Sequence, residues 1–339
     1  MNLFLIASPL QYLNAVEAKH HFGFNAQECV LCFCESTMKN RMQLLNIINA
    51  DEWGAVHFIP QALNKYFFWM PYKILDCILK EIGAISYIFI GEYRNEFMKY
   101  YAVAVKSEKI FLLDDGNVTI LISKLRAAGK EGSPNYVRRS ILYASALRFI
   151  GIKPQRVGTL NYFTVYNLAP GIGESVVNNS FTFIKRKHSA GVASVDNRIY
   201  FLGTELDFAY PTPIVKNEEY MKLMVKVRAY FKDSDIVYFP HRSEPDGKLN
   251  TLENELNIHV QRIDMPIEIH LIKNAIYPKI LAGFYSTAFD NLKIIFPNVV
   301  CTAFQIDRDK IHPDYRVYIQ NIYDYYEENY KKNFCVVKL

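Results

Sequence analysis

Two adjacent carboxylates, Asp114 and Asp115, follow an apolar run of four residues and precede Gly116. Residues 110–113 are typical of a buried parallel strand, and open α/β sheets bind ligands beyond the carboxyl ends of such strands. Gly116 lets the backbone turn sharply there. The tripeptide therefore either delivers two acids to a ligand-binding crevice or forms an ordinary Asp-Gly surface turn.

The second half of the chain holds three further candidates. His241 comes directly after the apolar residues 236–239 and Pro240, and a histidine in that place can donate a proton to a departing phosphate oxygen. Ser286 and Thr287 stand at a predicted helix N-terminus, which suits a phosphate. Glu268 opens another predicted helix, either as a first-turn charge or as an acceptor for a ribose hydroxyl. Each residue taken singly also has a structural interpretation, as a buried histidine, an N-cap or a dipole-balancing acid.

The motifs that could bind a metal or carry out redox chemistry do not lie where such sites are usually found. The pairs Asp233-Ser-Asp235 and Asp307-Arg-Asp309 match an Asp-x-Asp pattern, but the first precedes its strand and the second lies in a polar loop. We therefore predict no metal site. The spacing Cys29-x-x-Cys32 falls within a predicted strand, whereas a redox pair opens a helix, so we expect buried free thiols and a reducing compartment.

Length and composition favour a globular protein of two domains. The chain has 339 residues, of which 50% are hydrophobic, 22% charged and 14% aromatic. The net charge of +5 is small for a nucleic-acid binder but suits anionic substrates or an anionic membrane face. No apolar run reaches the ~18 residues of a membrane span, and residues 1–7 lack the basic start of a signal peptide. We expect a cytoplasmic protein.

The elements that would position these residues alternate between strands and helices. Residues 3–7 form a predicted strand, and Ser8 at N-cap, Pro9 at N1 and Gln11 at N3 give a capping-box pattern for a helix ending near His20. The same rhythm continues to Asp114 and restarts at residue 199, which predicts two parallel sheets. The predicted parts are an acceptor-side domain (1–166), a linker (167–197), a donor-binding domain (198–312) and a C-terminal helix and tail (313–339).

Two stretches outside this rhythm have open interpretations. Residues 126–135 form either a lid beside the acidic turn or a surface loop. Residues 64–73 are aromatic with flanking lysines. They fit a contact with the inner face of a membrane, a homodimer face or a buried helix.

The order of the motifs resembles that of the bacterial sialyltransferases that fold as GT-B enzymes, which carry an acidic pair with Gly, a His-Pro motif and a Ser-Ser/Thr motif. The opening Ala7-Ser8-Pro9-Leu10-Gln11 is similar to the start of glycosyltransferase family 52, the lipooligosaccharide sialyltransferases. The resemblance extends to about Leu292 and is most specific over residues 265–288. It implies an α/β fold of the GT-B type, two Rossmann-like domains with a crevice between them.

The resemblance also implies a role for each matching residue. Asp114 would be the general base toward the acceptor hydroxyl, with Asp115 as its supporting partner, and His241 would be the general acid or stabilise the leaving CMP phosphate. Glu268 would hold the cytidine ribose. Arg242 stands where the family has proline, and would add a phosphate contact. The other residues expected at the donor and substrate sites are Ser286, Thr287, Gly203, Thr204, Gly116, Ser8, Pro9 and Gln11.

The predicted activity is the inverting transfer of sialic acid, or a related nonulosonic acid, from its CMP donor to a galactose-type hydroxyl of a bacterial surface glycan such as lipooligosaccharide or capsule. Such a transfer needs a base on the acceptor side and charge neutralisation at the phosphate. An unperturbed pKa of ~3.9 would leave Asp114 ionised and ready to accept the proton. The expected partners are CMP-sialic acid and a glycan, without nucleic acid, metal or other cofactor. The alternatives are the same fold with a CMP-Kdo, CMP-legionaminic, CMP-pseudaminic or UDP-hexose donor, or a catalytically silent binding module.

Overall fold

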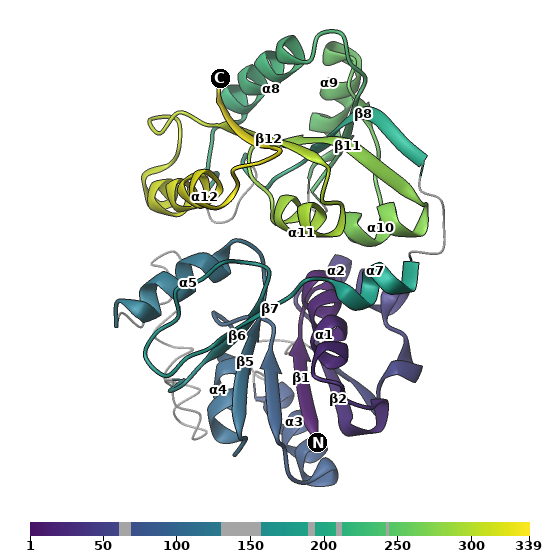
Figure 1. Cartoon of the computed structure of the whole chain (residues 1–339), viewed down its shortest axis with the longest axis vertical. Helices are drawn as coiled ribbons and strands as arrows, with labels where there is room; N and C mark the ends of the chain where they lie inside the picture. The colour runs from purple at the N-terminus through teal and green to yellow at the C-terminus, as the bar shows by residue number, and fades with distance from the viewer. Residues whose placement is uncertain (61–68, 130–156, 189–193, 208–211, 242–243) are drawn as a thin grey trace. The chain divides into compact units, whose positions relative to one another are not determined.

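The computed structural model describes residues 1–60, 69–129, 157–188, 194–207, 212–241 and 244–339 (Figure 1). The chain divides into two compact units, Met1–Ile184 and Lys185–Leu339, and each is described by itself. Each unit is built on one parallel sheet with helices between successive strands. This confirms the predicted fold class, since two Rossmann-like units in one chain make up the GT-B architecture.

The N-terminal unit is doubly wound. Its seven strands lie in the order β3-β2-β1-β4-β5-β6-β7 and are all parallel, so the chain leaves β1 first toward one edge and then toward the other. The strands are β1 (Asn2–Ile6), β2 (Cys29–Cys34), β3 (Ala55–Ile59), β4 (Tyr87–Ile90), β5 (Lys109–Leu113), β6 (Asn161–Thr164) and β7 (Val176–Asn178). The helices are α1 (Pro9–His21), α2 (Met38–Ile47), α3 (Met70–Ile82), α4 (Glu96–Ala104), α5 (Val118–Ala127) and α7 (Thr182–His188).

The C-terminal unit repeats this plan with six parallel strands in the order β10-β9-β8-β11-β12-β13. The strands are β8 (Ser194–Leu202), β9 (Ile236–Phe239), β10 (His259–Val260), β11 (Ile276–Gly283), β12 (Val300–Gln305) and β13 (Phe334–Lys338). The helices are α8 (Asn217–Tyr230), α9 (Asp246–Leu256), α10 (Ile267–Lys273), α11 (Thr287–Ile295) and α12 (Arg316–Asn329).

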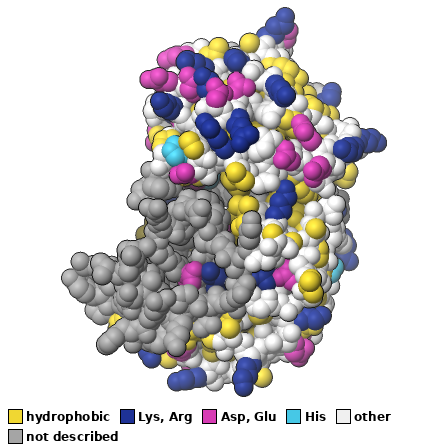
Figure 2. All heavy atoms as spheres, turned by 90° about the vertical axis from the view of Figure 1, so that its left-hand side faces the viewer, with side chains coloured by type: hydrophobic (Ala, Val, Ile, Leu, Met, Phe, Trp, Pro, Cys, Tyr) yellow, Lys and Arg dark blue, Asp and Glu magenta, His cyan; other side chains and the backbone are white. Residues whose placement is uncertain are grey.

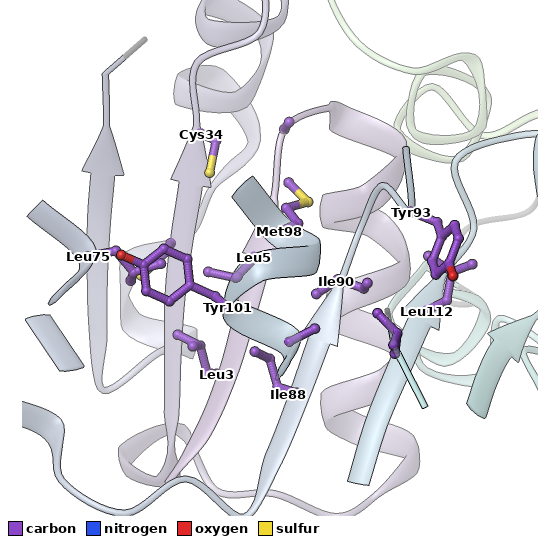
Figure 3. Packing of buried hydrophobic residues seen from close by; sticks show 14 of the residues in the cluster. Leu3, Leu5, Cys34, Leu75, Ile88, Ile90, Tyr93, Met98, Tyr101 and Leu112 are labelled. Carbon is purple, nitrogen blue, oxygen red and sulfur yellow. The ribbon is translucent and has the colours of Figure 1, made fainter. Parts of the chain in front are cut away.

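Strand β1 is apolar from Leu3 to Ile6 because both faces of its sheet are covered. Leu3 and Leu5 point into one cluster, which α3, α4 and α5 close, whereas Phe4 and Ile6 point into a second cluster with α1 and α2. Figure 3 shows the first cluster, with Met98 of α4 over the side chains of the central strands. A continuous apolar run is the pattern expected of a strand buried on both faces.

Local signals set the start of α1 as predicted. Ser8 is the N-cap, its hydroxyl accepts from the N–H of Gln11, and Pro9 occupies the first turn. The capping box itself is incomplete, because the Gln11 side chain accepts from the N–H of Ala7 and not from that of Ser8.

The stretch predicted as a linker, residues 167–197, differs from the structure. Strand β7 lies within it and pairs with β6, and β8 already begins at Ser194. This stretch is rich in Gly, Asn and Ser, which disfavour strands. The strand around Val176 and Val177 was therefore not predicted from the sequence. Residues 313–339 contain a helix, α12, and the tail after it forms β13, which pairs with β12.

Several predicted features lie outside the described residues. They are all but the first four residues of the proposed lid (126–135), the first half of the aromatic stretch (64–68) and Arg242. In the described half of that stretch, Pro71 stands in the first turn of α3.

Acidic and basic side chains are interspersed over the described part of the face shown in Figure 2, where neither sign dominates. Among the described residues, no helix has both the length and the apolar character that crossing a bilayer requires.

Candidate functional site

The N-terminal sheet reverses its strand order between β1 and β4. In open α/β sheets the carboxyl ends of the strands beside such a switch point form the usual ligand site. The residues that follow β1, β4, β5 and β6 therefore stand at one edge. They include Gln11, Glu92, Asp114, Asp115 and Val165.

Asp114 is buried at this edge, with 1% of its surface exposed. Its Oδ1 accepts from the Thr164 hydroxyl at 2.7 Å and its Oδ2 from the backbone N–H of Val165 at 2.8 Å. Burial raises the pKa of Asp114 to about 7, although these two hydrogen bonds favour the ionised form. Asp114 is therefore less acidic than its unperturbed value implies, and its carboxylate ties the end of β5 to the end of β6.

Asp115 has a different environment. Its side chain keeps 20% exposure, and its Oδ2 lies 3.2 Å from the Arg94 guanidinium. The Gln11 amide donates to its Oδ1 at 2.6 Å. Gly116 has φ +88°, a value that an L side chain rarely adopts, and so permits the turn that follows the two aspartates.

Glu92 and Arg94, which the sequence analysis did not single out, complete this group. Arg94 donates to Glu92 through Nε at 2.7 Å and through a terminal nitrogen at 2.5 Å. Burial and the neighbouring charge of Glu92 raise the pKa of Asp115. Burial also acts to raise the pKa of Glu92, but hydrogen bonds from Asp115 and Arg94 outweigh it and lower that pKa to about 2. Of these two coupled carboxyl groups, Asp115 therefore binds a proton more readily than Glu92 does. The position of Glu92 directly after a strand and Gly91 was the signal that could have identified it.

Gln11 is held in place on both sides of its amide. Its Oε1 accepts from the N–H of Ala7 at 2.6 Å while its nitrogen donates to Asp115. A Cβ at position 91 would lie 2.2 Å from this Oε1, so a glycine there makes room for the amide. Ser8 and Pro9, also predicted at the substrate site, are buried and act as the cap and first turn of α1.

In the C-terminal unit, His241 follows β9 and is half-buried. Its backbone N–H donates to Oε2 of Glu244 at 2.9 Å. Glu244 is fully buried and also accepts from the Tyr238 hydroxyl at 2.7 Å. The Nζ of Lys248 lies 2.6 Å from Oε1 of Glu244 and 2.6 Å from Oδ1 of Asp207, and forms an ion pair with each. A buried, paired carboxylate therefore fixes the turn that carries His241.

Gly203 and Thr204 join the strand ends of the C-terminal unit. A Cβ at Gly203 would lie 2.8 Å from the backbone nitrogen of His241 and 2.9 Å from Oε2 of Glu244, so only glycine allows this close approach. The Thr204 hydroxyl donates to the carbonyl of Tyr285 at 2.6 Å. That bond bridges β8 and β11, between which this sheet reverses its strand order.

Ser286 and Thr287 begin α11 as predicted. The Ser286 hydroxyl caps the helix by accepting from the N–H of Ala288 at 3.2 Å. The Tyr326 hydroxyl accepts from the N–H of Ser286 at 3.3 Å and donates to its carbonyl at 3.2 Å. A phosphate at this helix end would therefore replace Ser286 as the partner of the first-turn N–H groups.

Glu268 stands in the first turn of α10 and is 5% exposed. Asn291 of α11 donates to its Oε1 at 2.6 Å. Burial raises the pKa of Glu268, although the Asn291 hydrogen bond opposes the shift. A ribose hydroxyl would have to approach its second oxygen.

The structure thus gathers the predicted residues in two places, one in each unit. Gln11, Asp115 and Gly116 meet at the edge of the first sheet, and Gly203, Thr204, His241 and Ser286 follow neighbouring strands of the second. Among the described residues, no group of three His, Cys, Asp or Glu side chains could hold a metal ion.

Known proteins resemble this chain in structure only. No family model and no curated protein matches its sequence. The GT-B domain of a sialyltransferase from Photobacterium damselae is 14% identical, with 100% of both chains covered and a TM-score of 0.49. An α/β-galactoside α-2,3-sialyltransferase from Photobacterium phosphoreum is 12% identical over 99% of this chain and 98% of that one, with a TM-score of 0.48. The E. coli heptosyltransferase WaaC with ADP is 10% identical over 98% and 99%, with a TM-score of 0.40. Similarity at this level identifies neither a family nor a substrate.

Proposed function

We propose that this protein is an inverting, metal-independent glycosyltransferase that moves sialic acid, or a related nonulosonic acid, from its CMP donor to a galactose-type hydroxyl of a bacterial surface glycan. The observation that carries the proposal is the placement of two complementary groups of side chains. The acidic turn stands at the switch point of one parallel sheet, and a histidine and a capped helix N-terminus follow strands of the other.

In the proposed reaction the N-terminal unit supplies a carboxylate that takes the proton from the acceptor hydroxyl. The C-terminal unit binds CMP: Ser286, Thr287 and the N-terminus of α11 hold the phosphate. His241 donates a proton to the departing phosphate oxygen or stabilises its charge. Glu268 accepts a hydrogen bond from the ribose.

Thermal denaturation with nucleotides tests the donor class. CMP should raise the Tm because a ligand that binds only the folded state stabilises it, and UDP should not. If UDP alone raised the Tm, the donor would be a UDP-sugar and the sialyl transfer would be wrong.

A further inference from the structure

We propose that the reaction base is Asp115, acting as a proton-sharing pair with Glu92, and that Asp114 holds the turn without touching substrate. This inference rests on the proposed function and names the carboxylate that performs it. Gln11 and Arg94 are positioning residues for the pair.

Access separates the two aspartates. Asp114 is 1% exposed, and each of its oxygens accepts a short hydrogen bond from the end of β6. A base must come within about 2.6–3.2 Å of the proton that it abstracts, and an acceptor sugar could reach Asp114 only by displacing Thr164 and Val165. Asp115 is the next residue, and its side chain retains 20% exposure.

Orientation also favours Asp115. The Gln11 amide is fixed by the N–H of Ala7 and by the missing side chain at Gly91, and it donates to Oδ1 of Asp115. Arg94 contacts Oδ2 from the other side. Unlike Asp114, Asp115 stays partly exposed with these contacts in place, so its carboxylate is held in position and still open to an acceptor.

Glu92 can share with Asp115 the proton that Asp115 takes from the acceptor. As the acceptor O–H bond breaks, a bond forms between the acceptor oxygen and the anomeric carbon of the donor, and the bond from that carbon to the CMP phosphate oxygen breaks with its electron pair. The proton passes to Asp115, is shared with Glu92, and leaves to water after the product departs. Arg94 stabilises the pair when it has lost this proton.

The charged side chains that act on Asp115 are Glu92 and Arg94, both from the turn after β4. The pair must lose its shared proton before it can accept another. We therefore expect kcat/KM to rise with pH along an acid limb above the usual range of an aspartate. Glu92→Gln removes the like charge beside Asp115, so it should move this limb to lower pH. A side chain with a purely structural role would not move it.

The matched variants Asp115→Asn and Asp114→Asn test the assignment. With CMP-sialic acid and a galactoside, Asp115→Asn should lose about 10²–10⁴-fold in kcat, the usual contribution of a general base, while CMP still raises its Tm. Asp114→Asn should lower the Tm of the protein and reduce kcat by less than about tenfold, because its carboxamide keeps an acceptor for Val165.

The opposite pattern would overturn the inference: full turnover in Asp115→Asn, or loss of turnover in Asp114→Asn at an unchanged Tm. If the acid limb of kcat/KM were at the same pH in Glu92→Gln as in the wild type, Glu92 would not be coupled to the base. Wild-type protein that transfers no sugar from any CMP donor would instead overturn the proposed function, and the role of Asp115 with it.

Discussion

Asp114 and Asp115 are neighbours in sequence but differ in burial, and this decides what each can do. Asp114 is hydrogen-bonded to residues at the end of β6, whereas Asp115 contacts side chains that follow β1 and β4. The sequence alone could not rank them. The strand that supplies the partners of Asp114, β6, was not among the predicted elements, so the pocket that receives its carboxylate was not visible either.

The raised pKa of Asp114 predicts a pH dependence of stability. Between its usual pKa near ~3.9 and about 7, the folded protein holds a proton on Asp114 that the unfolded chain has lost. The contribution of Asp114 to the free energy of unfolding must therefore fall as the pH rises through that range. In Asp114→Asn the urea midpoint should change less between pH 5 and pH 8 than in the wild type. An equal change in both proteins would contradict the assigned pKa.

The buried ion pairs of Lys248 predict a large loss of stability on its removal. Lys248 is 6% exposed and neutralises Asp207 and Glu244, so Lys248→Met leaves two buried carboxylates uncompensated. Breaking a buried pair in this way costs about 3–5 kcal/mol, which calorimetry should show as a marked drop in Tm. The control Lys222→Met removes a lysine that is 68% exposed and pairs with Glu219, and an exposed pair of this kind contributes little to stability. Equal effects of the two substitutions would contradict this explanation.

At the scale of elements, the turns after parallel strands carry most of the candidate site. The alternation of apolar runs and helical patterns was enough to predict most of these strands and the start of α1. The same alternation did not predict helix α9. This helix begins with Asp246-Gly247 and has no strong start signal, because its N-cap is Pro245 and makes no side-chain hydrogen bond.

Gly203 provides a prediction for the packed strand ends of the C-terminal unit. In Gly203→Ala the new methyl group would meet the backbone of His241 and Phe239, which cannot move away as a flexible side chain could. We expect a lower Tm and a lower kcat, because the turn that carries His241 must shift. Gly247→Ala is the control, since no atom lies within 4 Å of its added Cβ and alanine favours a helix. If Gly203→Ala behaved like the control in both measurements, the close approach would not matter.

For the whole molecule, two doubly wound units follow from the sequence because most strands are apolar runs and most connections have a helical pattern. The roles that the resemblance implies could be judged only with the structure. Ser8, Pro9 and Thr204 are buried, and the Ser8 and Thr204 hydroxyls are hydrogen-bonded within their own units. The identity of the donor depends on contacts that side-chain patterns do not encode, and it has to be measured.

Product mass after incubation with CMP-sialic acid and a panel of galactosides tests the central claim most directly. Wild-type protein should convert at least one galactoside to a product heavier by one sialic acid residue, and Asp115→Asn should form almost none of it while still binding CMP. Transfer from a UDP-hexose alone, or no transfer to any galactoside from a CMP donor, would contradict the proposed function.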